Sequence, residues 1–201
     1  MTVAHFIGAK APRDLALARQ CTSGDRAAQK HLFADYKALI HNILFRILGS
    51  NREIEDLVQD SFLEVFRSLR NYRGEAKLST WIARITTRVA FAHISRRKPS
   101  AATLDSVPAL EADAPGADAH TGAREAARRL YGALERLDGK YRVPFALHVI
   151  DGRSLKEVAE ITESSLVATK SRVWRARREI FKRARRDPLL AEYLIEQGVE
   201  R

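Results

Sequence analysis

Cysteine is almost absent from this 201-residue sequence, in which Cys21 is the only one. A single cysteine excludes an intrachain disulfide, so the composition fits a reducing compartment. Long apolar runs are also missing, because no stretch approaches the roughly 20 residues that span a bilayer. Residues 1–13 lack the charged and then apolar order of a secretory signal. We therefore expect a protein of the cytosol that does not insert into a membrane.

The sequence also lacks any group of side chains that predicts catalysis or metal binding. None of its six histidines has a spacing such as HExxH, which would place two ligands on one face of a helix. They are better interpreted as exposed or partly buried residues of helices. Cys21 has no neighbouring His or Lys that would lower the pKa of its thiol. We expect no catalytic residue, no metal and no cofactor.

What the sequence does have is positive charge. It contains 35 Lys and Arg against 25 Asp and Glu, which gives a formal net charge of +10. With 45% hydrophobic and 30% charged residues, the composition is typical of one or two globular domains with heavily charged faces. A basic protein of this kind fits a polyanionic partner. Nucleic acid and an anionic membrane surface are both compatible with the charge.

The charge is unevenly distributed along the chain. Residues 99–122 hold four acidic side chains and no Lys or Arg, and they are rich in Ala, Pro and Gly. Such a segment cannot bury enough apolar surface to fold alone. We predict a flexible acidic linker there. The predicted divisions are a mobile arm at 1–12, a first domain at 13–98, the linker at 99–122, a second domain at 123–186, and a tail with a possible short helix at 187–201.

Apolar residues recur at three- and four-residue steps through the first domain and predict a bundle of packed helices. A short helix is expected from Arg13, and a longer one from Asp25 to a C-terminal stop at Gly49. The next stretch, Glu55–Arg70, combines an apolar face with an acidic face.

A polar break at residues 71–75 separates that helix from another, which Ser79 or Thr80 is expected to cap. The second helix of the pair ends in basic residues, 95–98. One helix is therefore acidic outside while the next ends basic, which suggests two different partners.

The second domain is also predicted to be helical. One helix is expected to end at Asp138, and another follows in which Pro144 is tolerated only if it lies in the first turn. Ser154 and Glu157 have the spacing of a capping box, which predicts the start of a short third helix.

A long helix is expected from Leu166 to about Arg185. At about 100° per residue, it has an apolar side formed by Leu166, Thr169, Val173, Ala176 and Ile180, and a small or basic side opposite. A short helix, a tight turn and a long helix of this kind predict a helix-turn-helix that docks in the DNA major groove. A solvated basic face that docks on nothing is the alternative.

Several of these motifs resemble those of a known family. The residues Asp56-Leu57-Val58-Gln59-Asp60, Tyr72-Arg73-Gly74-Glu75 and Thr80-Trp81 are similar to region 2 of bacterial sigma factors of the extracytoplasmic-function (ECF) branch. Residues 157–161 and 170–177 resemble region 4 of the same family. The resemblance implies an all-α protein with a region 2-like helix bundle and a region 4-like helix-turn-helix. It implies a transcription initiation factor, not an enzyme, that directs core RNA polymerase to promoters.

The resemblance also implies partners and site residues. In the family the first helix of the pair binds the β′ clamp helices of core RNA polymerase, and the matching residues are Asp56, Leu57, Gln59, Asp60 and Glu64. The following loop and helix read and open the −10 element, through Tyr72, Lys77, Ser79, Thr80, Trp81, Arg84, Thr87, Arg88, Arg96 and Arg97. The long helix reads the −35 element, through Ser165, Ala168, Lys170, Ser171, Arg172, Arg175, Arg178 and Lys182. The polymerase β flap, an anti-sigma factor and a bacterial cytoplasmic location are implied as well.

The sequence departs from the family pattern at four positions. Glu163 and Val167 stand where the family usually has glycine, so we expect the turn of the helix-turn-helix to be made differently. Arg88 and Ala92 stand where Asn and Asp are common, near the −10 DNA. These departures bear on whether the usual −10 and −35 sequences are recognised, but not on the role that the resemblance implies.

Two other functions have to be compared with this one. A sigma-like decoy that sequesters an anti-sigma factor need not keep a basic recognition helix, which this sequence has. A stand-alone helix-turn-helix regulator does not need the acidic-faced helix Glu55–Arg70. Trp81 also has two interpretations, because it shares a face with Ile85 and Val89 and fits a core, but an aromatic there also fits stacking on a melted base.

Overall fold

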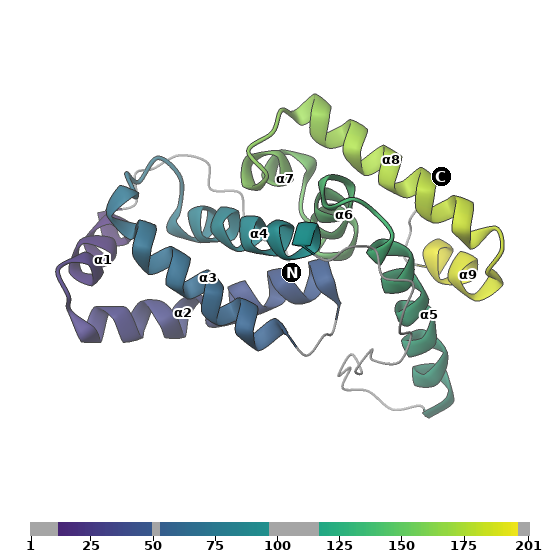
Figure 1. Ribbon diagram of the computed structural model, residues 1–201, viewed down its shortest axis with the longest axis horizontal. Helices are drawn as coiled ribbons and strands as arrows, with labels where there is room; N and C mark the ends of the chain where they lie inside the picture. Colours follow the sequence, from purple (N-terminus) through teal and green to yellow (C-terminus); the bar gives the residue numbers. More distant parts are fainter. Residues whose placement is uncertain (1–11, 50–52, 97–116, 197–201) are drawn as a thin grey trace.

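The computed structural model describes residues 12–49, 53–96 and 117–196 (Figure 1). The described residues form helices joined by short turns, and no strand occurs among them. The helices fall into two groups, α1–α4 and α5–α9, and the second group lies against α2 and α4 of the first (Figure 1). The predicted all-α fold with two helical parts is confirmed. In the described part of the chain, no helix is both long and apolar enough to cross a membrane.

The first group begins with α1 (Pro12–Thr22) and α2 (Arg26–Leu48), and continues with α3 (Ile54–Ser68), a 3₁₀ turn (Leu69–Asn71) and α4 (Leu78–Arg96). Helices α2, α3 and α4 pack against one another and bury their apolar faces in one core. Pro12 was placed in the N-terminal arm, but it starts α1, where a missing N–H costs nothing. The rest of that arm lies outside the described residues.

Both ends of α2 are fixed by the residues that the sequence indicates. At the start, Asp25 Oδ1 accepts the N–H groups of Ala27 and Ala28, at 2.8 and 3.2 Å. At the end, Gly49 has a φ of +72°, and its N–H donates to Phe45 O at 2.8 Å. The expected stop at Gly49 is therefore confirmed, because a residue with a side chain rarely adopts this conformation.

The start of α4 differs from the prediction. The helix begins at Leu78, so neither Ser79 nor Thr80 is its N-cap. The cap comes from another helix, because Asp14 Oδ2 in the first turn of α1 accepts the N–H of Leu78 at 2.9 Å. These residues are 64 positions apart, so a local pattern could not reveal the contact.

The second group consists of α5 (Ala117–Glu135), α6 (Gly139–Phe145), a π-helical turn η2 (Ala146–Ile150), α7 (Leu155–Ile161), α8 (Leu166–Ala184) and α9 (Pro188–Glu196). Helix α5 begins within the segment predicted as linker, whose last residues are therefore helical. The rest of that segment, through residue 116, lies outside the described residues. Helix α9 packs against α5 and α8 through the buried Leu190 and Leu194.

The position of Pro144 also differs from the prediction. It lies near the C-terminal end of α6 and not in its first turn. Proline has no N–H to donate, so the regular helical ladder is interrupted at this point. The chain continues as the wider turn η2, in which Asp151 N–H donates to Ala146 O, five residues earlier.

The two groups of helices share one apolar core. Five buried residues of the second group belong to the same cluster as the core of α1–α4, namely Val143, Ala146, Leu147, Val158 and Ile161. Helix α6 also approaches α4 closely, since a Cβ added at Gly139 would lie 3.0 Å from the ring of Phe91. The second group is therefore held against α4 and α2 by packing.

Polar contacts at the C-terminal end of α2 reinforce this packing. The guanidinium of Arg142, a residue that is only 5% exposed, donates to Ile47 O at 2.9 Å and Leu48 O at 3.2 Å. The hydroxyl of Tyr131 lies 3.2 Å from Arg46 O as donor. Burial raises the pKa of Tyr131 to about 12, so its phenol keeps the proton that it donates at neutral pH.

We expect Asp14→Ala to destabilise the protein by about 1 kcal/mol, because losing a cap of this type costs roughly 0.5–2 kcal/mol. Denaturant unfolding followed by circular dichroism measures the change. Asp14→Asn is the matched control, since it keeps an oxygen that can accept the N–H of Leu78. An Asp14→Ala protein as stable as the wild type would show that α4 does not depend on this cap.

Candidate nucleic-acid interface

The acidic residues predicted to bind polymerase lie on the outer face of α3. Asp56, Gln59, Asp60 and Glu64 are all exposed. Leu57 is different, because it is 6% exposed and belongs to the core. Its side chain supports the helix and is not available on the surface.

Two exposed apolar side chains that the sequence reasoning missed lie near this face. Leu63, one turn beyond Gln59, is 53% exposed, and Phe33 of α2 is 43% exposed. The Phe33 ring contacts Phe62 of α3, with ring centroids 4.4 Å apart. An apolar residue outside the helix's apolar stripe, as Leu63 is, was the signal available in the sequence. Acidic and apolar groups together form a surface suited to a protein rather than to DNA.

The residues predicted for the −10 element lie along α4 and the loop before it. Lys77, Arg88 and Arg96 are exposed, while Ser79, Thr80, Trp81 and Arg84 are half-buried. Tyr72 and Thr87 are buried, so neither presents its side chain openly to a partner. The remaining one, Arg97, lies outside the described residues. The side chains available on the surface are therefore mainly basic, with one tryptophan among them.

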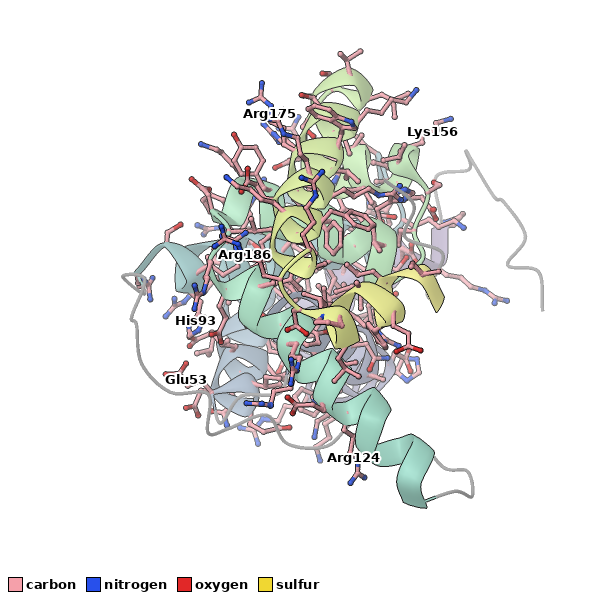
Figure 2. All side chains as sticks on the ribbon, turned by 90° about the vertical axis from the view of Figure 1, so that its right-hand side faces the viewer. Glu53, His93, Arg124, Lys156, Arg175 and Arg186 are labelled. Carbon is pink, nitrogen blue, oxygen red and sulfur yellow. The ribbon has the colours of Figure 1, made fainter. Side chains whose placement is uncertain are left out.

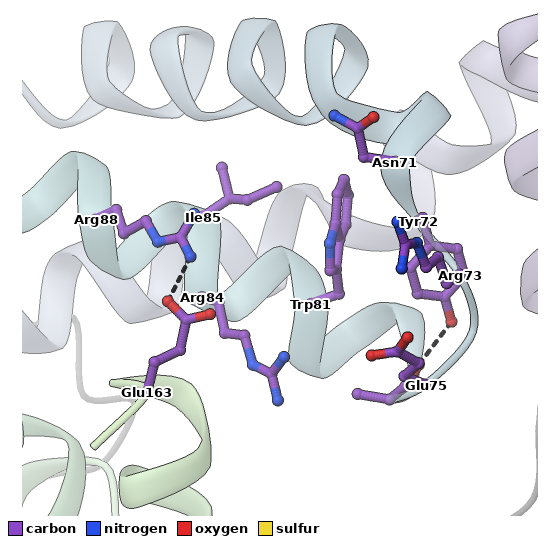
Figure 3. Close-up of a pocket in the computed structure, with 10 residues that line it drawn as sticks. Asn71, Tyr72, Arg73, Glu75, Trp81, Arg84, Ile85, Arg88 and Glu163 are labelled. Atoms are coloured by element: carbon purple, nitrogen blue, oxygen red, sulfur yellow. Dashed lines mark hydrogen bonds and ion pairs between the residues drawn. The ribbon is translucent and has the colours of Figure 1, made fainter.

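A cavity of about 290 Å³ opens between this loop and α4 (Figure 3). Its lining includes Asn71, Arg73 and Glu75 from the loop, Trp81, Arg84 and Arg88 from α4, and Glu163 from the second group of helices. It thus combines an aromatic ring with three arginines, the side chains that hold a nucleic-acid strand by stacking and by charge.

The position of Trp81 is compatible both with a core residue and with an aromatic ring that stacks on a base. The side chain packs on the core of α1–α4 and also lines the cavity. Its ring lies against Tyr72, with centroids 5.4 Å apart and planes inclined by 57°. Tyr72 is buried, and its hydroxyl donates to Ala76 O at 2.7 Å. Burial and the nearby carboxylate of Asp14 raise the pKa of Tyr72 to about 12, so this donor is retained at neutral pH.

The second group of helices contains the predicted helix-turn-helix. Ser154 and Glu157 form the capping box at the start of α7, with Ser154 Oγ accepting the Glu157 N–H and Glu157 Oε2 accepting the Ser154 N–H. At the end of α7, the Ser164 N–H donates to Ala159 O at 2.9 Å. The Ser164 hydroxyl lies 2.7 Å from that of Thr169 in α8. These bonds fix the angle between α7 and α8.

The sequence suggested that this turn is made differently, because Glu163 stands where the family usually has glycine. Glu163 has a φ of +50°, and it is the only non-glycine residue with a positive φ in the described ranges. The chain therefore takes the left-handed conformation that favours glycine, but with a glutamate. Val167 lies in the first turn of α8 and is 78% exposed, so it needs no special backbone.

Helix α8 presents most of its predicted DNA-reading residues to the surface. Ser165 caps the helix by accepting the Ala168 N–H. Lys170, Ser171, Arg175, Arg178 and Lys182 are exposed, whereas Ala168 and Arg172 are half-buried. Arg175 extends outward from α8 (Figure 2), and its Nη1 donates to the Tyr141 hydroxyl at 3.3 Å. The side chains on this outer face are small near the start of α8 and basic farther along.

Two other residues of α8 differ from the expectation or were missed. Leu166 was assigned to the apolar side but is 43% exposed, because the first turn extends beyond the packing that begins at the buried Thr169. Trp174 is 57% exposed, and the guanidinium of Arg178 lies 5.5 Å from the centre of its ring. A large aromatic residue between basic ones was the signal in the sequence.

The described histidines and Cys21 are the candidates for a metal or thiol site. Among the described residues, no three His, Cys, Asp or Glu side chains lie close enough to hold a metal ion. His31 contacts a single carboxylate, with 3.2 Å from its Nε2 to Asp35 Oδ2. Cys21 is buried, and burial raises the pKa of its thiol, which agrees with its interpretation as a packed residue.

Comparison with known proteins identifies both groups of helices. The family model for Sigma-70 region 2 matches residues 32–99, and the one for Sigma-70 region 4 matches residues 127–180. The chain is 26% identical over 176 residues to the ECF RNA polymerase sigma-E factor of Salmonella typhimurium, covering 83% of this chain and 92% of the relative. It is 28% identical to the ECF sigma factor SigW of Bacillus subtilis, covering 83% of this chain and 94% of SigW.

Two solved structures share the fold. CnrH, solved in complex with the cytosolic domain of CnrY, matches with a TM-score of 0.60 at 22% identity, covering 87% of this chain and 98% of CnrH. The sigma factor RpoE of Bartonella quintana, solved with the anti-sigma factor NepR, matches with a TM-score of 0.57 at 20% identity over 86% of this chain and 98% of RpoE. The two sigma regions occur in this order, and the relatives match over most of their length. The chain therefore belongs to the ECF sigma factors: it is not an enzyme but a transcription initiation factor that directs RNA polymerase to promoter DNA.

Proposed function

We propose that the two groups of helices divide promoter recognition between them. Helices α1–α4 bind core RNA polymerase and read and open the −10 element, while α5–α8 read the −35 element. The observation that supports this most strongly is the cavity beside α4, where Trp81 lies among Arg73, Arg84 and Arg88. On the outside of the same small bundle, α3 is acidic, so each partner has its own face.

The outer face of α3 is proposed to contact core polymerase. Asp56, Asp60 and Glu64 repel DNA phosphates but attract a basic protein surface, which in this family is that of the β′ clamp helices. Phe33 and Leu63 add exposed apolar area next to these charges, and interfaces between proteins combine both kinds of contact. The β flap is proposed as a second contact of polymerase with α5–α8.

The loop before α4 and α4 itself are proposed to hold one strand of the −10 element. Lys77, Arg84, Arg88 and Arg96 supply positive charge for its phosphates. Trp81 offers a ring on which an unstacked base can lie, a contact worth about 1–3 kcal/mol. Stacking of this kind favours the open strand over the duplex and so assists melting.

Helix α8 is proposed to dock in the major groove at the −35 element. Ala168 and Ser171 are small enough to let the helix approach the groove, while Arg172 and Arg175 reach base edges. Arg178 and Lys182 lie farther along the outer face, where phosphates are the nearer partners. A stand-alone regulator would need only this element, so the acidic face of α3 favours the sigma function.

A regulator that binds the protein is also proposed. The two structural neighbours were solved with the cytosolic domain of CnrY and with the anti-sigma factor NepR, which suggests an anti-sigma factor for this chain as well. The bacterial cytoplasm, where polymerase and DNA are found, is the proposed location. A decoy role is disfavoured by the basic outer face of α8.

Run-off transcription with core polymerase tests the proposed function. We expect a transcript from a promoter selected by this protein, and none without it. The double change Asp56→Lys and Asp60→Lys is expected to abolish both transcription and pull-down of core polymerase. Both side chains are exposed, so the melting temperature should barely change. Undiminished pull-down by this variant would exclude the α3 face as the polymerase contact.

Trp81 provides a test of the −10 assignment. We expect Trp81→Ala to reduce transcription from a duplex promoter at least about fivefold, but much less from a template already open at the −10 element, because about 1–3 kcal/mol of stacking is lost. Trp81→Phe keeps an aromatic ring and should be mild. If Trp81→Ala instead lowers helicity and impairs both templates equally, the side chain acts in the core alone.

The two ends of the outer face of α8 are expected to behave differently. Arg175→Ala should cost about 1–3 kcal/mol on the cognate −35 duplex and relax discrimination at one position. Lys182→Ala should weaken binding to all DNA sequences alike, and it should lower the slope of log affinity against log salt concentration by about one. Titrations at several salt concentrations on cognate and scrambled duplexes measure both effects.

Tyr141→Phe is the control for Arg175, because it removes the hydroxyl that Arg175 contacts but leaves the arginine in place. Equal losses on both duplexes for Arg175→Ala and Lys182→Ala would show that α8 is only an electrostatic anchor.

A further inference from the structure

The face of α4 assigned to the −10 element is partly covered by the helix-turn-helix of the same chain. Arg84 donates through Nε to Glu160 O at 3.1 Å and through Nη2 to Glu160 Oε1 at 3.4 Å. One turn farther along α4, the Arg88 guanidinium forms an ion pair with the carboxylate of Glu163 (Figure 3). Two arginines that suit DNA phosphates are thus paired with acidic residues at the end of α7.

The contact affects both DNA-reading faces. Glu163 lines the cavity that contains Trp81. It also lines a second cavity of about 300 Å³, between α4 and α6–α8, together with Arg88 and Arg172. Arg172 of the recognition helix therefore faces α4 in this arrangement. A DNA strand that followed α4 would meet the carboxylate of Glu163 and the turn that carries it.

The backbone at Glu163 gives a separate reason to regard this contact as functional. A left-handed conformation costs an L-residue roughly 1–2 kcal/mol, which glycine would avoid. The hydrogen bonds that hold the turn come from Ser164 and Thr162. The side chain of Glu163 instead reaches Arg88, on the other group of helices. A glutamate is therefore kept at an unfavourable position, where its carboxylate binds an arginine of the −10 face.

The exposure of these ion pairs indicates how much they stabilise the contact between α4 and the helix-turn-helix. The side chains of Arg88 and Glu163 are 66% and 48% exposed, and ion pairs in such places contribute about 0–1 kcal/mol and weaken with salt. The apolar contacts of α6 and α7 with α4, and of η2 with α2, contribute more. The closed arrangement thus rests on packing, and the ion pairs add a small increment that a polyanion can displace.

We propose that Glu160 and Glu163 act as an autoinhibitory latch: in the closed arrangement, which packing maintains, they cover Arg84 and Arg88 of the −10 face until the two groups of helices separate. This inference rests on the proposed assignment of α4 to the −10 element. In the closed state the carboxylates take the place of phosphates, so the free protein binds DNA weakly. Separation releases both arginines and exposes the side of α8 that carries Arg172.

The test measures closure and DNA binding separately, in the full chain without polymerase. Donor and acceptor dyes are attached at Arg67→Cys on α3 and Lys156→Cys on α7, both exposed positions, in a chain that carries Cys21→Ala. The variant is Glu163→Gly, which relieves the left-handed backbone and should leave the protein folded. Because packing holds the closed arrangement, energy transfer is followed while single-stranded DNA is added, and in Glu163→Gly it should fall at a lower DNA concentration than in the wild type. Affinity for a 20-nucleotide single strand of mixed sequence should rise about two- to fivefold, the range expected for one exposed ion pair.

The matched control is Glu192→Gln, an exposed position on α9 that changes the net charge by the same amount. It should leave the DNA concentration at which energy transfer falls nearly unchanged, and alter DNA affinity less than Glu163→Gly does. A charge exchange provides a second check. Arg88→Glu and Glu163→Arg should each lower the urea concentration at which energy transfer is lost when made alone, and together they should restore it.

The latch would be overturned if energy transfer in Glu163→Gly fell at the same DNA concentration as in the wild type. It would also be overturned if Glu192→Gln shifted that concentration and the DNA affinity as much, because the effect would then reflect net charge alone. Failure of the proposed function would be recognised by a different result, namely that the wild-type protein and core polymerase give no run-off transcript.

Discussion

The arrangement of the two groups of helices depends on the C-terminal end of α2. The last carbonyl groups of a helix have no partners within it and carry partial negative charge. Here Arg142 supplies a buried guanidinium to Ile47 O and Leu48 O, and Tyr131 approaches the carbonyl of Arg46. Gly49 leaves room for this, since a Cβ there would lie 2.8 Å from the Tyr131 ring. A charge buried in this way is strongly favoured only where such acceptors surround it.

The position of the functional faces follows from this attachment. With α6 held at the end of α2, the apolar residues Val158 and Ile161 of α7 complete the core beside α4. The turn after α7 then lies over the outer side of α4, which brings Glu163 to Arg88. The acidic face of α3 lies elsewhere on the bundle and stays exposed. The free protein can therefore expose the face proposed for polymerase while the faces proposed for DNA are turned toward each other.

Residues close together in the chain explain most of what the sequence could predict. The 3.6-residue period located α2, α3 and α8, and the caps at Asp25, Ser154 and Ser165 act within three residues of their own positions. Contacts between distant residues were beyond such patterns. Asp14 caps α4 from 64 positions away, and Arg142 reaches α2 across more than 90 positions. The burial of Tyr72 and Thr87 also arises from tertiary packing, so it could not be read from their place in a motif.

Glu163 shows how a local departure acquires its meaning from a distant partner. Taken alone, a glutamate at a position that favours glycine predicts a different turn. In the structure the glutamate takes the left-handed conformation that favours glycine, with φ +50°. Glu163 and Arg88 are both exposed, and both stand where the family commonly has another residue. They lie 75 positions apart in the chain, and the carboxylate of one contacts the guanidinium of the other. A pair that contributes at most about 1 kcal/mol cannot offset the strain by much. Stability is therefore a weak explanation for this glutamate, and control of access to the face proposed for the −10 element is a better one.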